Sequence, residues 1–217
     1  MTKKATTIKT EIVGIPINYV SKQNSKMPCR SWDLPARKTC PGSYNKDGSI
    51  VDVCKKCYAS KGTYCFRCVK QVRENNMLAW QKNDWVDLMV EELKNDRNFR
   101  FFTSGDGYKI ELWYKIYQIA IRSPECNIWI PTRMHKFPVF RQVIDMLNQL
   151  KNVVVRFSSD SLDGEKIDGD QTSVVISNLD QLSPEMSLCE SYANKGKCGK
   201  CRKCWAKDIR VIAYKLH

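Results

Sequence analysis

Eleven cysteines dominate the chemistry that this sequence offers. Cys54 and Cys57 form a C-x2-C pair, and Cys40 precedes them behind a loop rich in Gly, Ser, Asn and Asp. Two thiolates at the C-x2-C spacing can bind one metal centre without straining the backbone between them. We therefore predict that Cys40, Cys54 and Cys57 are metal ligands.

A second group of cysteines lies near the end of the chain and consists of Cys189, Cys198, Cys201 and Cys204. Four thiols at close spacing suit a complete structural zinc site or a fully ligated iron–sulfur cluster. Spacing alone does not separate these two, because both kinds of site use thiolates. In a further alternative, this group lends one ligand to the first cysteines.

Four cysteines fall outside these two groups. Cys65 and Cys68 form another C-x2-C pair, which could supply a fourth ligand, form a zinc site with the preceding C-x2-C pair, or consist of core thiols. Cys126 stands alone beside a predicted strand and is expected to be a small buried hydrophobe. Cys29 precedes the first group, and its role stays open.

Length and composition favour one globular domain in a reducing compartment. The chain has 217 residues, 42% of them hydrophobic, and no apolar run near the roughly 18 residues that a membrane span needs. The basic N-terminus has no apolar segment after it, so we expect no secretory signal and a cytoplasmic location, where clustered cysteines bind metal more often than they form disulfides. The expected organisation is a single domain (1–217) with a cysteine-rich cluster loop (24–68), a β/α core (69–180) and a C-terminal cysteine segment (181–217).

The formal net charge of +13 indicates a possible anionic partner. Nucleic acid is one candidate, because lysine-rich surfaces neutralise phosphates. A merely solvated basic surface is the alternative. Part of the charge would also disappear on metal binding, since each ligating thiolate is negative.

Strand-like and helix-like segments alternate along the middle of the chain, which predicts a parallel sheet covered by helices. Residues 24–43 are expected to form an ordered loop, held to the core by Trp32 and Leu34. Asn83 and Asp84 are expected to divide the first long helical segment. Strands are predicted at 8–20, 99–103, 127–132, 153–157 and 173–177, and helices at 69–95, 110–122 and 137–150.

Polar residues follow three successive predicted strands. Because the carboxyl ends of parallel strands share one edge of the sheet, these residues are expected to meet there. A cap on the following helix is the alternative role for each Asp or Ser. His135, on the same edge, could bind substrate, but we expect it to be a solvated loop residue. The predicted site residues are Ser104 and Asp106 after the first strand, Thr132 and Arg133 after the second, and Ser158, Ser159 and Asp160 after the third.

Several separate motifs together resemble those of the phage gene product 88 family. They span roughly residues 24 to 205, and the resemblance implies a phage protein without implying a reaction. The motifs are KMP-x-x-S-W-x-L-P at 26–35, T-C-P-G-S at 39–43, C-Y-A at 57–59, S-G-D at 104–106, T-R at 132–133 and C-G-x-C-R-x-C-W at 198–205.

The same residues also resemble the radical S-adenosylmethionine enzymes. That resemblance implies a partial (β/α) barrel in which three cysteines, here Cys40, Cys54 and Cys57, hold a [4Fe-4S] cluster with one iron open to S-adenosylmethionine. The cysteine spacing departs from that family, because C-x13-C-x2-C replaces C-x3-C-x2-C. The implied cosubstrate-binding residues are Ser104, Gly105, Asp106, Thr132, Arg133, Ser158 and Asp160.

The sequence thus favours an iron–sulfur protein, with a radical-type enzyme of unknown substrate as the leading hypothesis. The preference for iron over zinc rests mainly on the resemblance. The alternative is a zinc-stapled basic protein that binds nucleic acid or modulates a host protein without catalysis.

Overall fold

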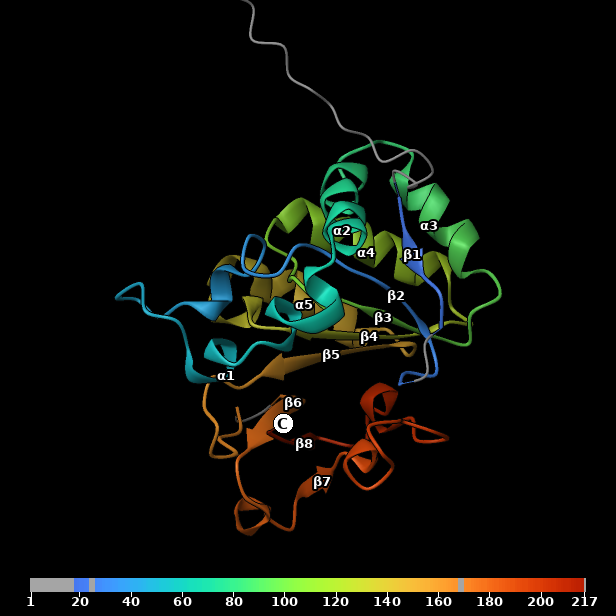
Figure 1. Ribbon diagram of the computed structural model, residues 1–217. Coiled ribbons are helices and arrows are strands. Elements are labelled where there is room, and N and C mark those ends of the chain that lie inside the picture. Colours follow the sequence, from blue (N-terminus) through green and yellow to red (C-terminus); the bar gives the residue numbers. More distant parts are fainter. Residues whose placement is uncertain (1–17, 24–25, 168–169, 217) are drawn as a thin grey trace, which may run out of the picture.

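Eight strands hydrogen-bond side by side in one sheet in the computed structural model, which describes residues 18–23, 26–167 and 170–216. The strand order is β1-β2-β3-β4-β5-β6-β8-β7, and all neighbouring pairs are parallel except β1 and β2 (Figure 1). The strands are β1 (Val20–Ser21), β2 (Arg30–Trp32), β3 (Asn98–Phe101), β4 (Asn127–Thr132), β5 (Val153–Ser158), β6 (Thr172–Ile176), β7 (Met186–Leu188) and β8 (Val211–Lys215).

Helices cover one face of this sheet and form the main core with it. Side chains alternate between the two faces of a strand, so Phe99 and Phe101 of β3 point toward the helices while Arg100 points away. Leu112 and Trp113 on the buried face of the fourth helix are fully buried in the same core. The helices are α1 (Asp52–Lys55), α2 (Arg67–Ala79), α3 (Trp85–Leu93), α4 (Ile110–Arg122) and α5 (Pro138–Gln149).

The opposite face of the sheet is covered partly by the C-terminal segment. Trp205 packs edge to face on Trp129 of β4, with ring centroids 5.4 Å apart. Its indole N–H donates to the carbonyl of Phe99 in β3 at 2.8 Å. Arg100 stacks over the same Trp129 ring, 4.2 Å from its centroid. This face therefore carries a cation stacked on an indole, whereas the helix-covered face is lined by aliphatic and aromatic groups.

The predicted mostly parallel α/β sheet is confirmed, and it is open. Among the described residues the strands do not close into a barrel, and β1 adds an antiparallel edge. The likeness to the partial barrel of radical enzymes stays a prediction. No helix in the described ranges is long and apolar enough to cross a membrane.

Most predicted elements of the middle of the chain match the structure. α4 and β4 have the predicted bounds, and the predicted long helix divides into α2 and α3, with Asp84 at the N-cap position of α3. Trp32 and Leu34 are fully buried, as expected. The expectation of a loop at 24–43 is wrong at Arg30–Trp32, which form β2, and β8 was not predicted. Of the predicted strand at 8–20, residues 8–17 lie outside the described ranges.

Candidate cysteine site at the carboxyl edge of the sheet

The loop that carries Cys40 is fastened to the loop after β3. Leu34, just beyond β2, donates its backbone N–H to the carbonyl of Ser104 at 3.0 Å, and the Ser104 hydroxyl donates to the carbonyl of Leu34 at 2.8 Å. Gly105 has a φ of +75°, and a Cβ there would come within 2.6 Å of the Thr39 hydroxyl oxygen. Only glycine fits this conformation and this close approach without strain. The T-C and S-G-D motifs therefore form one tightly fitted unit.

Asp106 joins the loops that follow β3 and β4. Its Oδ1 accepts hydrogen bonds from the Thr132 hydroxyl and the Gly107 N–H, both at 2.7 Å. Its Oδ2 accepts from the backbone N–H of Arg133 at 2.8 Å. Burial raises the pKa of the Asp106 carboxyl to about 6, although these three donors favour its ionised form. Asp106 thus works first as an organiser of the edge.

Asp160 joins the loops that follow β4 and β5. Its carboxylate accepts from Arg133 Nε at 3.0 Å and from Lys136 Nζ at 2.6 Å. Its backbone carbonyl accepts from the N–H of Val53 in the cysteine loop at 3.2 Å. Lys136 also reaches the carbonyl of Gly42 at 3.1 Å, so the loop of Cys40 is held from this side too.

The first cysteine group, defined as Cys40, Cys54 and Cys57, lies on this fastened edge. Burial raises the pKa of Cys40 to about 12, and the neighbouring Asp106, Cys54 and Cys57 add to the rise. Burial also raises the pKa of Cys54, while the charge of Arg133 opposes the rise. The three thiols are close enough to influence one another, and all are free of disulfides. Without a metal, Cys40 and Cys54 therefore hold their protons at neutral pH, so metal binding would release protons.

The thiols of this group are not arranged to coordinate a single metal ion. Within residues 18–23, 26–167 and 170–216, no group of three or more His, Cys, Asp or Glu side chains is arranged so that it could hold a metal ion. The assignment of Cys40, Cys54 and Cys57 as ligands stays a prediction. The structure does bring Asp106, Thr132, Arg133 and Asp160 together, as the strand pattern indicated. Ser158 ends β5 and pairs in register with Ser173 of β6.

Two residues of this edge were missed by the sequence reasoning. Lys136 binds Asp160 from a short 3-10 helix, Met134–Lys136, and Asp33 accepts the N–H of Thr103 at 2.6 Å. Lys136 follows Arg133 by three residues, and this spacing from the T-R motif is the sequence feature that indicates its place at the same edge. Asp33 follows a strand that was itself not recognised.

The C-terminal cysteine group, defined as Cys189, Cys198, Cys201 and Cys204, lies elsewhere. The backbone N–H of Cys198 donates to the carbonyl of Lys26, which precedes β2, whereas the first group follows β2. Figure 1 shows the orange-red coils between β7 and β8 at the lower right, near the opposite end of the strands from α1. The structure therefore separates the two cysteine groups, and it gives no support to a shared ligand.

Arg156 fixes the C-terminal segment to the sheet. Its guanidinium, fully buried on β5, donates at distances from 2.7 to 3.4 Å to five backbone carbonyls of this segment. Those carbonyls belong to Lys203, Cys204, Ala206, Ile209 and Arg210. The Cys204 thiol also lies 3.1 Å from the Tyr214 hydroxyl of β8, and burial raises its pKa to about 11.

The remaining cysteines differ in their surroundings. Cys126 is buried, as expected. Cys29 is buried beside Trp129 and Trp205, and its strongly raised pKa arises first from that burial and also from nearby Cys198. Cys65 and Cys68 are exposed, so the alternative of core thiols is wrong for that pair.

His135 is not a solvated loop residue. Its ring stacks on Phe157 with centroids 4.3 Å apart, and burial lowers its pKa to about 4. Since the unfolded chain binds the proton near pH 6.5, the His135 contribution to stability is present above pH 6.5 and is lost as pH falls toward 4.

Compared with a His135→Phe variant, the native chain should lose about 2 kcal/mol of unfolding free energy between pH 7 and pH 5. Urea titrations at both pH values test this, and parallel pH profiles would contradict it.

Comparison with known proteins identifies the family of this chain. Neither the curated proteins nor the solved structures contain a match. A family model described as gene product 88 matches residues 2–207, nearly the whole chain. The match confirms the resemblance seen in the separate motifs and supports the prediction of a phage protein. The chain belongs to the gene product 88 family.

Proposed function

We propose that this protein is an iron–sulfur enzyme of the radical type, with a [4Fe-4S] cluster on the first cysteine group. One observation carries the proposal. Three mutually interacting free thiols stand on the loop after β2, the first parallel strand, and the S-G-D loop after the next strand is fastened to them. Functional groups of open parallel sheets collect at this edge.

A cluster is proposed here in preference to a single ion because, among the described residues, no three potential ligands are arranged to hold one ion. Each thiolate of a four-iron cluster binds a different iron atom, so the cysteines stand farther apart than they do around one zinc. With three cysteine ligands, such a cluster would keep one iron open to a cosubstrate. A bound cluster of this kind would supply the electron that cleaves S-adenosylmethionine. Arg133, whose charge acts on Cys54, would stabilise the thiolates.

Some of the predicted cosubstrate-binding residues would position the loops around the cosubstrate without contacting it. The Ser104 hydroxyl and both Asp106 oxygens are already engaged by the protein. We propose that they fix the loop while its backbone at Gly105 and the side chains of Arg133 and Ser158 face the cosubstrate. Thr132 and Asp160 would hold Arg133 in place through the bonds described above.

Anaerobic purification followed by an absorption spectrum and analysis of iron, sulfide and zinc tests the cluster. Matching iron and sulfide are expected, together with cleavage of S-adenosylmethionine after reduction. Cys40→Ser and Cys57→Ser variants should lose the cluster of the first group. Cys126→Ser, which removes a thiol buried in the main core, is the matched control and should keep it.

The C-terminal cysteine group is proposed as a separate structural metal site, filled by zinc or by a fully ligated cluster. Arg156 anchors the backbone around Cys204, the last of these four residues, to the sheet face away from the helices. Metal analysis of a Cys201→Ser variant distinguishes the two sites, because it should lose only this metal. A native protein that contains zinc alone would remove the radical chemistry and leave the nucleic-acid or host-modulating alternative.

A further inference from the structure

A stretch of the cysteine loop carries a concentrated positive charge. Between Asp52 and Glu74 the chain has six cationic residues and no acidic one. Among the described residues, Lys55 alone of the six has an ion pair, with Asp52 at 2.8 Å. Lys56, Lys61, Arg67 and Lys70 are exposed. Within the part of the chain that the structure describes, no acidic side chain forms an ion pair with these four, which favours an anionic partner.

Aromatic rings are exposed among these cations. The exposed fractions of Tyr58 and Phe66 are 54% and 58%. Tyr58 is held in place, because its hydroxyl donates to the carbonyl of Thr103 and its ring contacts Tyr64 edge to face with centroids 5.4 Å apart. Arg73 lies over the other ring of this pair, 4.4 Å from the Tyr64 centroid. Exposed apolar side chains that gather on one surface mark interaction sites.

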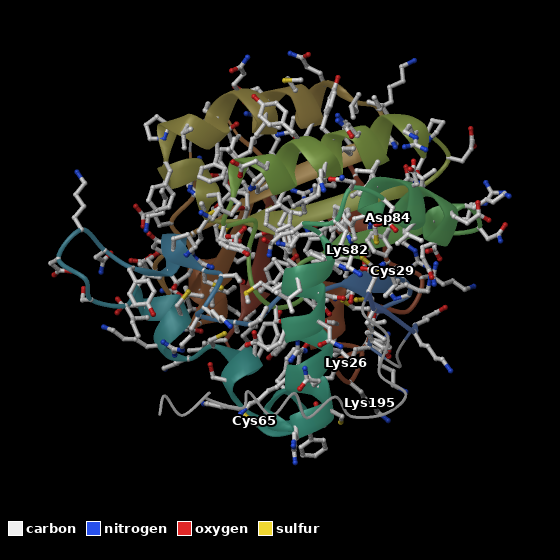
Figure 2. All side chains as sticks on the ribbon, turned by 90° about the horizontal axis from the view of Figure 1, so that it is seen from above. Lys26, Cys29, Cys65, Lys82, Asp84 and Lys195 are labelled. Atoms are coloured by element: carbon white, nitrogen blue, oxygen red, sulfur yellow. The ribbon has the colours of Figure 1, made fainter. Side chains whose placement is uncertain are left out.

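We propose that this basic aromatic surface, defined as Lys56, Tyr58, Lys61, Phe66, Arg67 and Lys70, binds single-stranded nucleic acid. Cations track the phosphates of such a strand, and aromatic rings stack on its bases. A duplex keeps its bases stacked inside and offers nothing to these rings. Figure 2 shows Cys65, which lies within the same segment, on the outer rim of the molecule near the start of α2.

The basic aromatic surface adjoins the first cysteine group. Cys57 of the first cysteine group stands between Lys56 and Tyr58 in the sequence, and Cys54 precedes Lys56 by two residues. A bound strand would therefore pass beside the proposed cluster. That nucleic acid is the substrate of the enzyme rests on the proposed function. That the surface binds nucleic acid does not rest on it, because no residue of the surface is a proposed ligand of the cluster.

Fluorescence anisotropy with a labelled single-stranded 20-mer RNA, measured over a range of salt concentrations, tests the binding. A variant with Lys56→Gln, Lys61→Gln, Arg67→Gln and Lys70→Gln should bind about 100-fold more weakly at 0.1 M salt. The slope of log K against log salt should fall by about 3, since each phosphate contact to a single strand contributes about 0.7.

A matched variant controls for net charge alone. Lys22→Gln, Lys94→Gln, Arg97→Gln and Lys151→Gln also removes three lysines and one arginine, all exposed. Both variants reduce the net charge equally, but the control positions lie away from the basic aromatic surface. The control should bind RNA within about threefold of the native chain. Equal losses in the two variants would overturn the proposal, because they would show a general charge effect.

Stacking is tested separately from charge. Phe66→Ala should weaken binding about tenfold with an unchanged salt slope. Tyr114→Ala removes an aromatic ring that is 40% exposed on α4 and should leave affinity unchanged. Duplex RNA bound as tightly as single-stranded RNA would overturn the proposal, as would no binding at 0.1 M salt. Cys40→Ser should retain binding after losing the cluster, so failure of the enzyme hypothesis and failure of this one are distinguishable.

Discussion

Replacing Arg156 with methionine is expected to destabilise the protein by about 3–5 kcal/mol and to release the C-terminal segment. Arg156 is fully buried, and no carboxylate forms an ion pair with it among the described residues; instead it donates to five carbonyls of residues 203–210. Methionine fills a similar volume but satisfies none of these acceptors. Buried carbonyls left without donors cost about 1–3 kcal/mol each unless water reaches them, so the segment should detach and hydrate.

Urea unfolding and limited proteolysis measure the two parts of this prediction. Cleavage within residues 203–210 should accelerate in Arg156→Met under native conditions, and the Trp205 environment should change in the fluorescence spectrum. Arg141→Met is the control, since Arg141 pairs with Asp145 and Asp170 on an exposed helix face and should contribute less than about 1 kcal/mol. Native resistance to proteolysis in Arg156→Met would show that other contacts hold the segment.

The role of Arg156 illustrates what the sequence could not reveal. Its segment, VVVRF, was recognised as a strand because four of its five residues are apolar. Nothing in that pattern shows that the arginine lies on the face covered by the end of the chain, because the covering segment has no regular periodicity of its own. β2 and β8 were missed for a related reason. β2 has only three residues and is defined by its pairing with β3, so local preference carries little information.

The elements that the sequence did predict have their own strong periodicity. α4 presents Leu112, Trp113, Ile116 and Ile119 at helical spacing, and β4 is a nearly continuous apolar run. Their order alone predicts that Asp106, Thr132 and Asp160 meet at one edge. The bonds among them could not be predicted, because they depend on loop conformations such as the positive φ of Gly105. Residues expected to face a cosubstrate thus turn out to bind one another.

Asp106→Ala is expected to cost about 3 kcal/mol of unfolding free energy, because it leaves the Thr132 hydroxyl and the N–H groups of Gly107 and Arg133 without their acceptor. The loop of Cys40 should loosen as well, since the Asp106 side chain fixes the position of its own backbone N–H, which donates to the Thr39 hydroxyl oxygen at 3.4 Å. Urea unfolding and the rate at which Cys40 reacts with a thiol reagent are the measurements. Asp145→Ala, on an exposed helix face, should change neither.

An asparagine at position 106 separates the charge from the hydrogen bonds. The pKa of Asp106 is about 6 when folded and 3.8 in its reference state, so its contribution to stability is greatest below pH 3.8 and is lost as pH rises through 6. The advantage of the native chain over Asp106→Asn should therefore shrink by about 2 kcal/mol between pH 4 and pH 7. His135 acts in the opposite direction over nearly the same range, since its lowered pKa favours stability at higher pH. The unfolding free energy of the native chain should consequently change little between pH 4 and pH 7. In each single variant it should change with pH in the direction set by the group that remains. An unfolding free energy that is independent of pH in the Asp106→Asn variant would contradict these opposing contributions.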